Sequence, residues 1–166
     1  WPRDDEKNVP DGEYLVRFNA EYEHGPHVEA RSPRFVVDST GPSVNATVRP
    51  VPFSPDGDGR DDILDFEIGV TDASDIRYWY IEVFDPAGMF FYDIGGEGEP
   101  PRTVRWDGRA RNGETVVSAE EYPWRLEVAD SLGNTNVSEG EIEVDVLLEP
   151  FGDGYKIRIP SITFAP

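Results

Sequence analysis

Apolar and polar side chains alternate in several short stretches of this chain, and this pattern constrains the fold most strongly. Residues 64–70 read LDFEIGV, with an apolar side chain at every second position. A period of two predicts a strand with one buried face. The same alternation recurs in residues 122–128 and 142–146, and no segment has the 3.6-residue period typical of an amphipathic helix. The sequence therefore predicts an all-β protein.

A β-hairpin is predicted in the middle of the chain. Residues 76–84 are rich in aromatic and β-branched side chains and end at the turn sequence DPAG of residues 85–88. Residues 89–94 then read as the returning strand, and the glycine- and proline-rich residues 95–101 read as a loop. Short strands separated by turns at this spacing indicate an immunoglobulin-like antiparallel β-sandwich.

The composition limits the partners and the compartment. The formal net charge of -19 argues against nucleic acid, because phosphates would repel the protein, and it suits an extracytoplasmic protein that meets divalent cations. An ordinary acidic surface explains the same charge equally well. The absence of cysteine excludes disulfides and cysteine-based zinc sites. No apolar run reaches the roughly 18 residues of a membrane-spanning helix, and no signal peptide is recognisable.

An internal repeat indicates two tandem modules. Tyr14 and Tyr122, each near the start of an alternating stretch, lie 108 residues apart, and Asp38 and Asp145, which follow later stretches, lie 107 residues apart. The offsets agree with the length of one immunoglobulin-sized domain, so residue 1 falls inside a domain and we expect a fragment of a longer protein. Chance similarity is the alternative, because such stretches are common in β proteins. The expected domains are the C-terminal half of a first immunoglobulin-like module at 1–39, a complete sandwich at 40–147, and a linker with the first strand of another domain at 148–166.

The run PDGDGRDD at residues 55–62 places four carboxylates within seven residues. Charges packed this closely repel one another unless a cation lies among them, and calcium prefers oxygen ligands. We expect Asp56 and Asp58 to bind calcium through side-chain oxygens. Arg60 would add its backbone carbonyl, and Asp62 a carboxylate or water-mediated contact, with further ligands from another loop. The alternative is an acidic turn that binds no ion.

Two sets of motifs lie within the predicted sandwich. One set comprises WDGR at residues 106–109, Asn112-Gly113, Glu121-Tyr122 and the pattern Asp130-x-x-Gly133-Asn134. The other is FSPDGDGRDD at residues 53–62. Together they resemble the immunoglobulin-like domain of flagellar hook-capping (FlgD-like) proteins, over residues 44–146 and more weakly over 1–38. The acidic run is also similar to the calcium loops of dockerin and thrombospondin repeats.

The resemblance to hook-capping proteins implies an accessory module of a secreted bacterial protein. The sequence departs from that family at Glu120-Glu121, where such domains usually carry a glycine before the tyrosine. The end of the chain adds a further resemblance, since YKIRIPSITF at residues 155–164 is similar to the first strand of an OmpA-like domain. Such domains typically bind peptidoglycan, but the aspartate and arginine that do so would lie downstream of this sequence. The resemblance implies a location in the bacterial periplasm or the outer-membrane-associated cell envelope.

Three classes of function remain open. We expect a non-catalytic spacer that presents the C-terminal domain, with calcium stiffening the acidic loop. Its partners would be the other domains of the same polypeptide and, through the downstream domain, peptidoglycan. A glycan hydrolase, which uses a pair of carboxylates, is the weakest candidate, because among 34 aspartates and glutamates some pair always looks plausible. The sequence also has no serine in a nucleophile-elbow pattern and no phosphate-binding glycine loop, which argues against other kinds of catalysis. His24 and His27, the two histidines, read as part of a solvated loop.

An adhesin or carbohydrate-binding module is the main alternative to a spacer. Trp79, Trp106 and Trp124, with the aromatic residues 90–92, could form a platform for a sugar ring. Trp79 is the surface candidate, because it is out of phase with its tyrosine neighbours, whereas Trp124 alternates in phase with the predicted core. Core packing explains the whole aromatic group as well.

Overall fold

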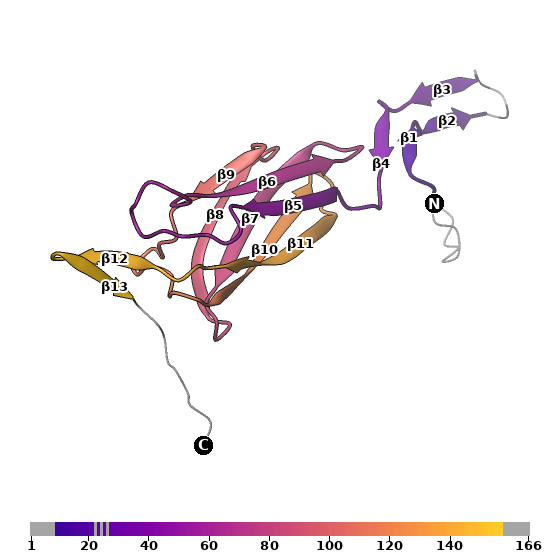
Figure 1. Ribbon diagram of the computed structural model, residues 1–166. Helices are drawn as coiled ribbons and strands as arrows, with labels where there is room; N and C mark the ends of the chain where they lie inside the picture. Colours follow the sequence, from indigo (N-terminus) through magenta and orange to yellow (C-terminus); the bar gives the residue numbers. More distant parts are fainter. Residues whose placement is uncertain (1–8, 22, 24, 26, 158–166) are drawn as a thin grey trace. The chain divides into compact units, whose positions relative to one another are not determined.

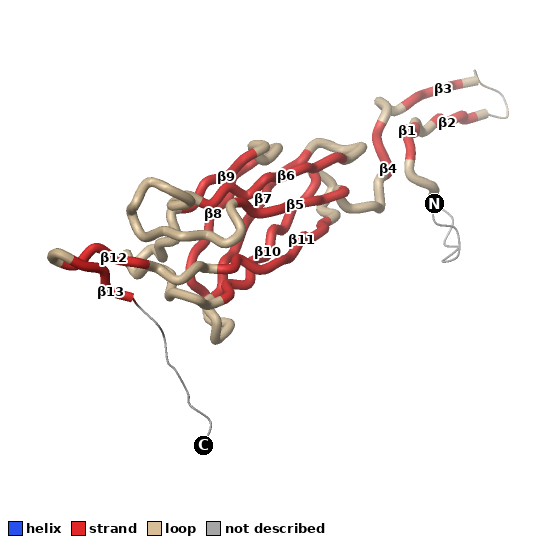
Figure 2. Tube along the Cα trace, viewed as in Figure 1, coloured by secondary structure: helices blue, strands red, loops and turns tan. Residues whose placement is uncertain are grey.

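The computed structural model describes residues 9–157 except residues 22, 24 and 26. Within this described part the chain forms strands and loops and no helix, which confirms the all-β prediction (Figure 1, Figure 2). The chain divides into two compact units, Trp1–Thr40 and Gly41–Pro166. The strands of the first unit are β1 (Gly12–Tyr14), β2 (Arg17–Ala20), β3 (Val28–Arg31) and β4 (Phe35–Val37). Those of the second are β5 (Ser43–Arg49), β6 (Leu64–Thr71), β7 (Ile76–Phe84), β8 (Phe90–Glu97), β9 (Thr103–Trp106), β10 (Glu121–Asp130), β11 (Thr135–Glu143), β12 (Leu148–Phe151) and β13 (Gly154–Ile157).

Strands β5 to β11 of the second unit form an antiparallel β-sandwich (Figure 1). One sheet has the order β5-β6-β9 and the other has the order β11-β10-β7-β8. The consecutive strands β6 and β7 lie in different sheets, as do β8 and β9, and β9 and β10. Because the chain crosses repeatedly between the layers, the two sheets share one core, as in immunoglobulin-like domains. The β-sandwich predicted from the alternating pattern is therefore confirmed.

The core lies between the two sheets and follows the predicted alternation. Leu64 and Phe66 of β6 are fully buried, as is Leu126 of β10. Phe66 contacts Trp124 edge to face, with ring centroids 5.7 Å apart, so the aromatic rings join the layers. Burial of each such large side chain stabilises the fold by roughly 1.5–3 kcal/mol. Trp106 and Trp124 are 2% and 4% exposed and therefore belong to this core.

The surface position predicted for Trp79 is wrong, because its side chain is only 7% exposed and lies in the core. Trp79 lies opposite Gly96 in the pairing of β7 and β8, and a Cβ on Gly96 would lie 3.1 Å from the indole nitrogen. Tyr80 lies opposite Gly95, where a Cβ would lie 2.6 Å from the tyrosine ring. The two glycines leave room for these rings, and β8 therefore continues to Glu97 where the sequence predicts a loop.

The alternating apolar residues at 142–146 do not belong to one strand. Ile142 is fully buried in β11, but the strand ends at Glu143. Val144 is buried because it forms a parallel bridge with Phe53, outside the two main sheets. Val146 is 44% exposed, so the prediction of one continuous strand is wrong beyond Glu143.

The segment after the sandwich forms a hairpin. Leu148–Phe151, predicted to be part of a linker, is strand β12 and pairs antiparallel with β13. The strand predicted at residues 155–164 overlaps β13 at Gly154–Ile157, and residues 158–164 lie outside the described part of the chain.

The first unit contains two short antiparallel sheets. Strand β1 pairs with β4, and β2 pairs with β3. A hydrogen bond from the Ser32 backbone N–H to the Val16 carbonyl, at 2.9 Å, continues the pairing between the two sheets. The unit therefore reads as one long hairpin that is interrupted once.

Candidate metal centre

The acidic run lies in the connection between β5 and β6 and is anchored to the core by Phe53. The Phe53 ring is fully buried and packs on Trp106, with ring centroids 5.8 Å apart. Its backbone N–H donates to the Glu143 carbonyl, and its carbonyl accepts from the Asp145 N–H, both at 2.8 Å. The start of the loop is therefore tied both to the core and to the chain that leaves β11.

Gly108 completes this anchor from the other side. Its φ of +76° is a backbone conformation that side chains disfavour. A Cβ there would lie 2.9 Å from both the Phe53 ring and Pro55 Cγ. Gly108 belongs to the WDGR motif and Phe53 to the acidic motif, so the two motifs that carry the family resemblance pack against each other.

Backbone N–H groups close the acidic loop around its aspartate side chains. Gly57 and Gly59 have φ values of +85° and +90°, which glycine adopts without a steric penalty. This conformation turns successive N–H groups toward the carboxylates, and the loop holds its shape through its own hydrogen bonds. The bonds are Gly57 N–H to Asp62 Oδ1 at 2.7 Å, Gly59 N–H to Asp62 Oδ2 at 2.8 Å, Asp58 N–H to Asp56 Oδ1 at 3.1 Å, and Arg60 N–H to Asp58 Oδ1 at 2.7 Å.

Three of the predicted ligands form one carboxylate cluster. Asp56, Asp58 and Asp62 each place one oxygen within 4.8 Å of the others. Like charges at such distances repel by about 1 kcal/mol per pair even in water, and the N–H donors offset part of that repulsion. Asp58 is exposed and the other two are partly buried, so the cluster is open to solvent on one side. Arg60 contacts the cluster through its backbone N–H, and its role as a carbonyl ligand stays a prediction.

A second acidic pair, which the sequence did not single out as a site, lies elsewhere in the sandwich. Asp72 and Asp130 bring carboxylate oxygens within 4.8 Å of each other. Asp72 Oδ2 is buried without a hydrogen-bond partner, whereas Oδ1 accepts from the Ser74 N–H at 3.0 Å. Asp130 is fully buried, and although burial raises its pKa, hydrogen bonds from Asn134, Gly133 and Leu132 outweigh that effect and lower the pKa. Asp130 therefore stays ionised and ties the turn between β10 and β11.

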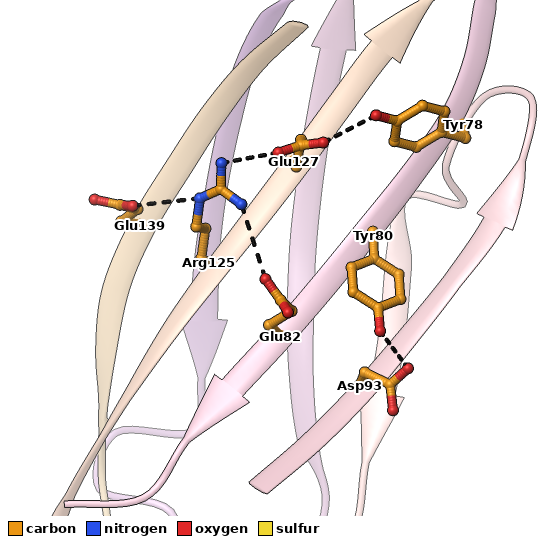
Figure 3. A network of polar contacts seen from close by, with 7 residues as sticks. All are labelled: Tyr78, Tyr80, Glu82, Asp93, Arg125, Glu127 and Glu139. Carbon is orange, nitrogen blue, oxygen red and sulfur yellow. Dashed lines mark hydrogen bonds and ion pairs between the residues drawn. The ribbon is translucent and has the colours of Figure 1, made fainter. Parts of the chain in front are cut away.

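Figure 3 shows a polar network on the sheet that contains β7 and β10. Arg125 lies among three carboxylates, at 2.8 Å from Glu127, 3.6 Å from Glu139 and 3.8 Å from Glu82. Tyr78 donates to Glu127 at 2.9 Å. Glu82 and Glu139 are the residues directly opposite Arg125 on the two neighbouring strands. Such half-exposed ion pairs each contribute under about 1 kcal/mol, so the network adds a modest link between neighbouring strands.

The same sheet carries a second cross-strand link. Tyr80 donates to Asp93, and Arg111 binds that carboxylate with a second contact at 2.8 Å (Figure 3 shows the tyrosine and the carboxylate). The hydrogen bond to Asp93 raises the pKa of Tyr80 to about 12. The bonds from Tyr80 and Arg111 lower the pKa of Asp93. At neutral pH the tyrosine is therefore protonated and the aspartate ionised, and the hydrogen bond between them links β7 to β8.

A shallow groove of about 340 Å³ lies beside the turn that joins β7 to β8. Phe90, which is 53% exposed, lines it together with Phe91 and Arg111. Of the aromatic residues predicted to form a sugar platform, Phe90 is thus exposed, whereas the three tryptophans are buried.

The structure describes His27, one of the two histidines predicted to lie in a solvated loop. His27 Nδ1 lies 3.8 Å from the Glu21 carboxylate, and both side chains are mostly exposed. His24 lies outside the described residues.

No family model and no curated protein matches the chain. Among solved structures, dimeric latent PorU from Porphyromonas gingivalis is similar to 82% of this chain, at 19% identity and a TM-score of 0.49. CopC from Methylosinus trichosporium OB3b is similar to 55% of this chain, at 19% identity and a TM-score of 0.35. The alignments cover 12% of the PorU chain and 81% of the CopC chain. Neither similarity assigns an activity to this protein.

Among the residues that the structure describes, none belongs to a helix with the length and hydropathy needed to cross a bilayer.

Proposed function

We propose that the sandwich is a non-catalytic, immunoglobulin-like spacer of a bacterial cell-envelope protein. The observation that supports this role most directly is the path of the chain through the second unit. The chain enters at Gly41-Pro42, which lies beside the start of β11, and the Asn136 side chain donates to the Pro42 carbonyl at 2.9 Å. It leaves after Glu143, at the other end of the same strand (Figure 1). Eight residue steps of a strand separate entry and exit by roughly 26 Å.

The exit is held in place on two sides. Asp145 donates its N–H to Phe53, and its carbonyl accepts from the Ala119 N–H at 3.1 Å. The Leu147 N–H donates to the fully buried Ser118 hydroxyl at 2.9 Å, and the Leu147 side chain is 3% exposed. A chain that is fastened through its backbone on both sides leaves the module in a fixed direction, as a spacer requires.

The proposal also includes a calcium ion that the acidic loop binds. In our account Asp56, Asp58 and Asp62 bind calcium, with the Arg60 carbonyl and groups outside the loop completing the ligand shell. The support is the cluster itself, in which three carboxylates converge beside the anchor at Phe53. Because hydrogen bonds already close the loop, the ion adds stability to a folded module rather than driving its folding. At about 100 times its dissociation constant it would add roughly 2.7 kcal/mol.

The location and the partners follow from the resemblances in the sequence. A module of the hook-capping type followed by an OmpA-like strand fits the periplasm or the outer-membrane-associated envelope. The spacer would present the downstream domain, and any contact with peptidoglycan would be made there.

The spacer role is tested by a distance measurement. The chain has no cysteine, so nitroxide labels on Ser43→Cys and Val146→Cys would be the only thiol-linked labels in the molecule. Ser43 begins β5, and Val146 follows the fastened exit. We expect one narrow distance distribution centred at about 30 Å, and the same label pair in denaturant should give a broad distribution as the control. A broad or multimodal distribution in native buffer would contradict the proposal.

A ligand-binding module is the second candidate, and the exposed Phe90 at the groove favours it. Phe90 offers one aromatic face for a sugar ring, while Arg111 lies in the same groove. Binding to a glycan array that Phe90→Ala removes and Met89→Ala retains would establish this function. Met89 is the matched control, because it is 67% exposed in the same turn and does not line the groove.

A further inference from the structure

The first unit repeats the strand register of the last two strands of the sandwich. Tyr14 lies opposite Phe35, as Tyr122 lies opposite Ile142. Segment β1–β2 therefore corresponds to β10, and β3–β4 corresponds to β11. The other matching opposite pairs are Phe18 with Ala30 and Leu126 with Ser138, and Ala20 with Val28 and Val128 with Asn136.

The hairpin of the first unit has an apolar face and, on the other side, a face that carries its charged side chains together with Val36, which lies opposite Glu13. Residues directly opposite each other share a face, so Phe18 and Ala30 point one way while their neighbours point the other. The charged face carries an ion pair between Arg17 and Glu29 at 3.5 Å. We call the side chains of Tyr14, Phe18, Ala20, Val28, Ala30, Phe35 and Val37 the apolar face.

The two phenylalanines of the apolar face are exposed, whereas their counterparts in the sandwich are covered. Phe18 is 61% exposed and Phe35 is 41% exposed, but the corresponding Leu126 and Ile142 are fully buried. Apolar side chains of this size that stay in water forgo much of the burial free energy that their counterparts gain in the sandwich. Exposed surface of this kind, opposite a charged face, marks an interaction surface.

The sandwich indicates what would cover the apolar face. The counterpart strand β10 pairs on its second edge with β7, and the sheet β5-β6-β9 covers its inner face. Among the described residues of the first unit, no strand pairs with the second edge of β1 or β2. Within the described residues of the first unit, the hairpin therefore has neither an edge neighbour on β1 or β2 nor a facing sheet.

We infer that the apolar face docks a set of antiparallel strands equivalent to β5–β9, supplied by a preceding segment of the same polypeptide. The docked strands carry apolar side chains at every second position, as β6 does at Leu64 and Phe66. The charged face stays in solvent. Completion of the first unit extends the proposed spacer to two sandwiches, but the inference concerns residues 12–37 alone and does not depend on the distance measured between Ser43 and Val146.

The test compares amide hydrogen exchange in the 166-residue chain and in the natural polypeptide with its preceding segment. We expect amides of residues 12–20 and 28–37 to exchange roughly 100-fold or more slowly in the longer polypeptide, because docking buries them. Phe18→Asp, on the apolar face, should abolish this protection. Asn19→Asp, its neighbour on the charged face, should leave the protection intact and serves as the matched control.

Two results would overturn the inference. One is equal exchange of residues 12–20 and 28–37 in the two polypeptides. The other is protection that appears in the 166-residue chain alone and rises with its concentration, since a second copy of the chain would then be the occupant. Phe18→Asp should leave exchange in the isolated 166-residue chain unchanged, which separates a lost docking contact from a misfolded hairpin.

Discussion

The hydroxyl oxygen of Tyr122 accepts a hydrogen bond at 2.8 Å from the backbone N–H of Val117, five residues earlier. Tyr122 is the second residue of β10, is 1% exposed, and packs edge to face on Phe91 with ring centroids 5.1 Å apart. A tyrosine at this place that bonds back to the preceding loop is the tyrosine corner of immunoglobulin-like sandwiches. The bond ties the loop that holds the exit segment to a side chain of the core.

Tyr122→Phe should destabilise the sandwich by about 1–3 kcal/mol, because the Val117 N–H loses its acceptor while the ring packing is kept. Urea unfolding followed by tryptophan fluorescence measures the change. Tyr78→Phe is the control, since Tyr78 bonds to the half-buried Glu127 and its loss should cost less. Equal losses of stability in the two variants would contradict a stabilising role for the hydrogen bond between Val117 and Tyr122.

Asp130→Asn should destabilise the protein at pH 7 by about 1.5–3 kcal/mol, because the charged acceptor of four hydrogen bonds becomes neutral. The pKa of Asp130 is lowered in the folded state, so its contribution to stability is present above its unfolded-state pKa of about 3.9. That contribution is lost as the pH falls through its folded-state pKa. The difference between wild type and variant should therefore shrink in acid. Denaturant unfolding between pH 7 and pH 2.5 measures it, and a difference that stays constant would contradict the prediction.

Tyr80 should titrate near pH 12, above the ordinary tyrosine value of about 10. The raised folded pKa means that its stabilising contribution is complete below pH 10 and is lost as the pH rises toward 12. Ultraviolet difference titration of wild type against Tyr80→Phe isolates this residue. Asp93→Asn should move the midpoint back toward 10, because the hydrogen bond to a carboxylate is the main cause of the shift. An unchanged midpoint in Asp93→Asn would contradict that cause.

Gly108→Ala should destabilise the sandwich more than Gly113→Ala does. Both glycines have positive φ, +76° and +86°, so both changes carry a backbone penalty of roughly 1–2 kcal/mol. The new Cβ at position 108 also meets the Phe53 ring and Pro55, whereas the site at position 113 is open. Thermal melting of the two variants compares them. Equal losses would mean that the contact with the acidic loop contributes nothing.

Much of the fold follows from the alternating pattern alone. The buried face of Leu64, Phe66 and Ile68, and that of Tyr122 and its strand, were predictable because a period of two has one structural meaning when a core covers one side. The acidic cluster was predictable because Asp56, Asp58 and Asp62 are close in the sequence.

Features that depend on pairing between distant strands were not predictable. Trp79 reads as a surface residue beside Tyr80, and Gly95-Gly96 reads as a loop, until the register places each aromatic ring over a glycine. The bond from Val117 to Tyr122 and the links around Arg125 likewise depend on the fold, because no local pattern specifies which acceptor a side chain will meet.

We propose that calcium bound by the acidic loop of residues 55–62 stabilises a non-catalytic spacer. Thermal melting with and without calcium tests this proposal most directly. The wild-type chain would be melted with calcium, with magnesium and with a chelator, beside Asp58→Asn and Asp61→Asn. Asp61→Asn is the matched control, because this change removes the same charge from the same loop while Asp61 lies outside the carboxylate cluster. The φ of 54° at this position suits asparagine as well.

We predict that calcium at about 100 times its dissociation constant raises the wild-type midpoint by roughly 10 °C. Asp61→Asn should keep most of the rise, and Asp58→Asn should lose it without a lower midpoint in chelator, because asparagine preserves the turn. Equal midpoints for the wild type in all three buffers would contradict the claim and leave the loop as an acidic turn.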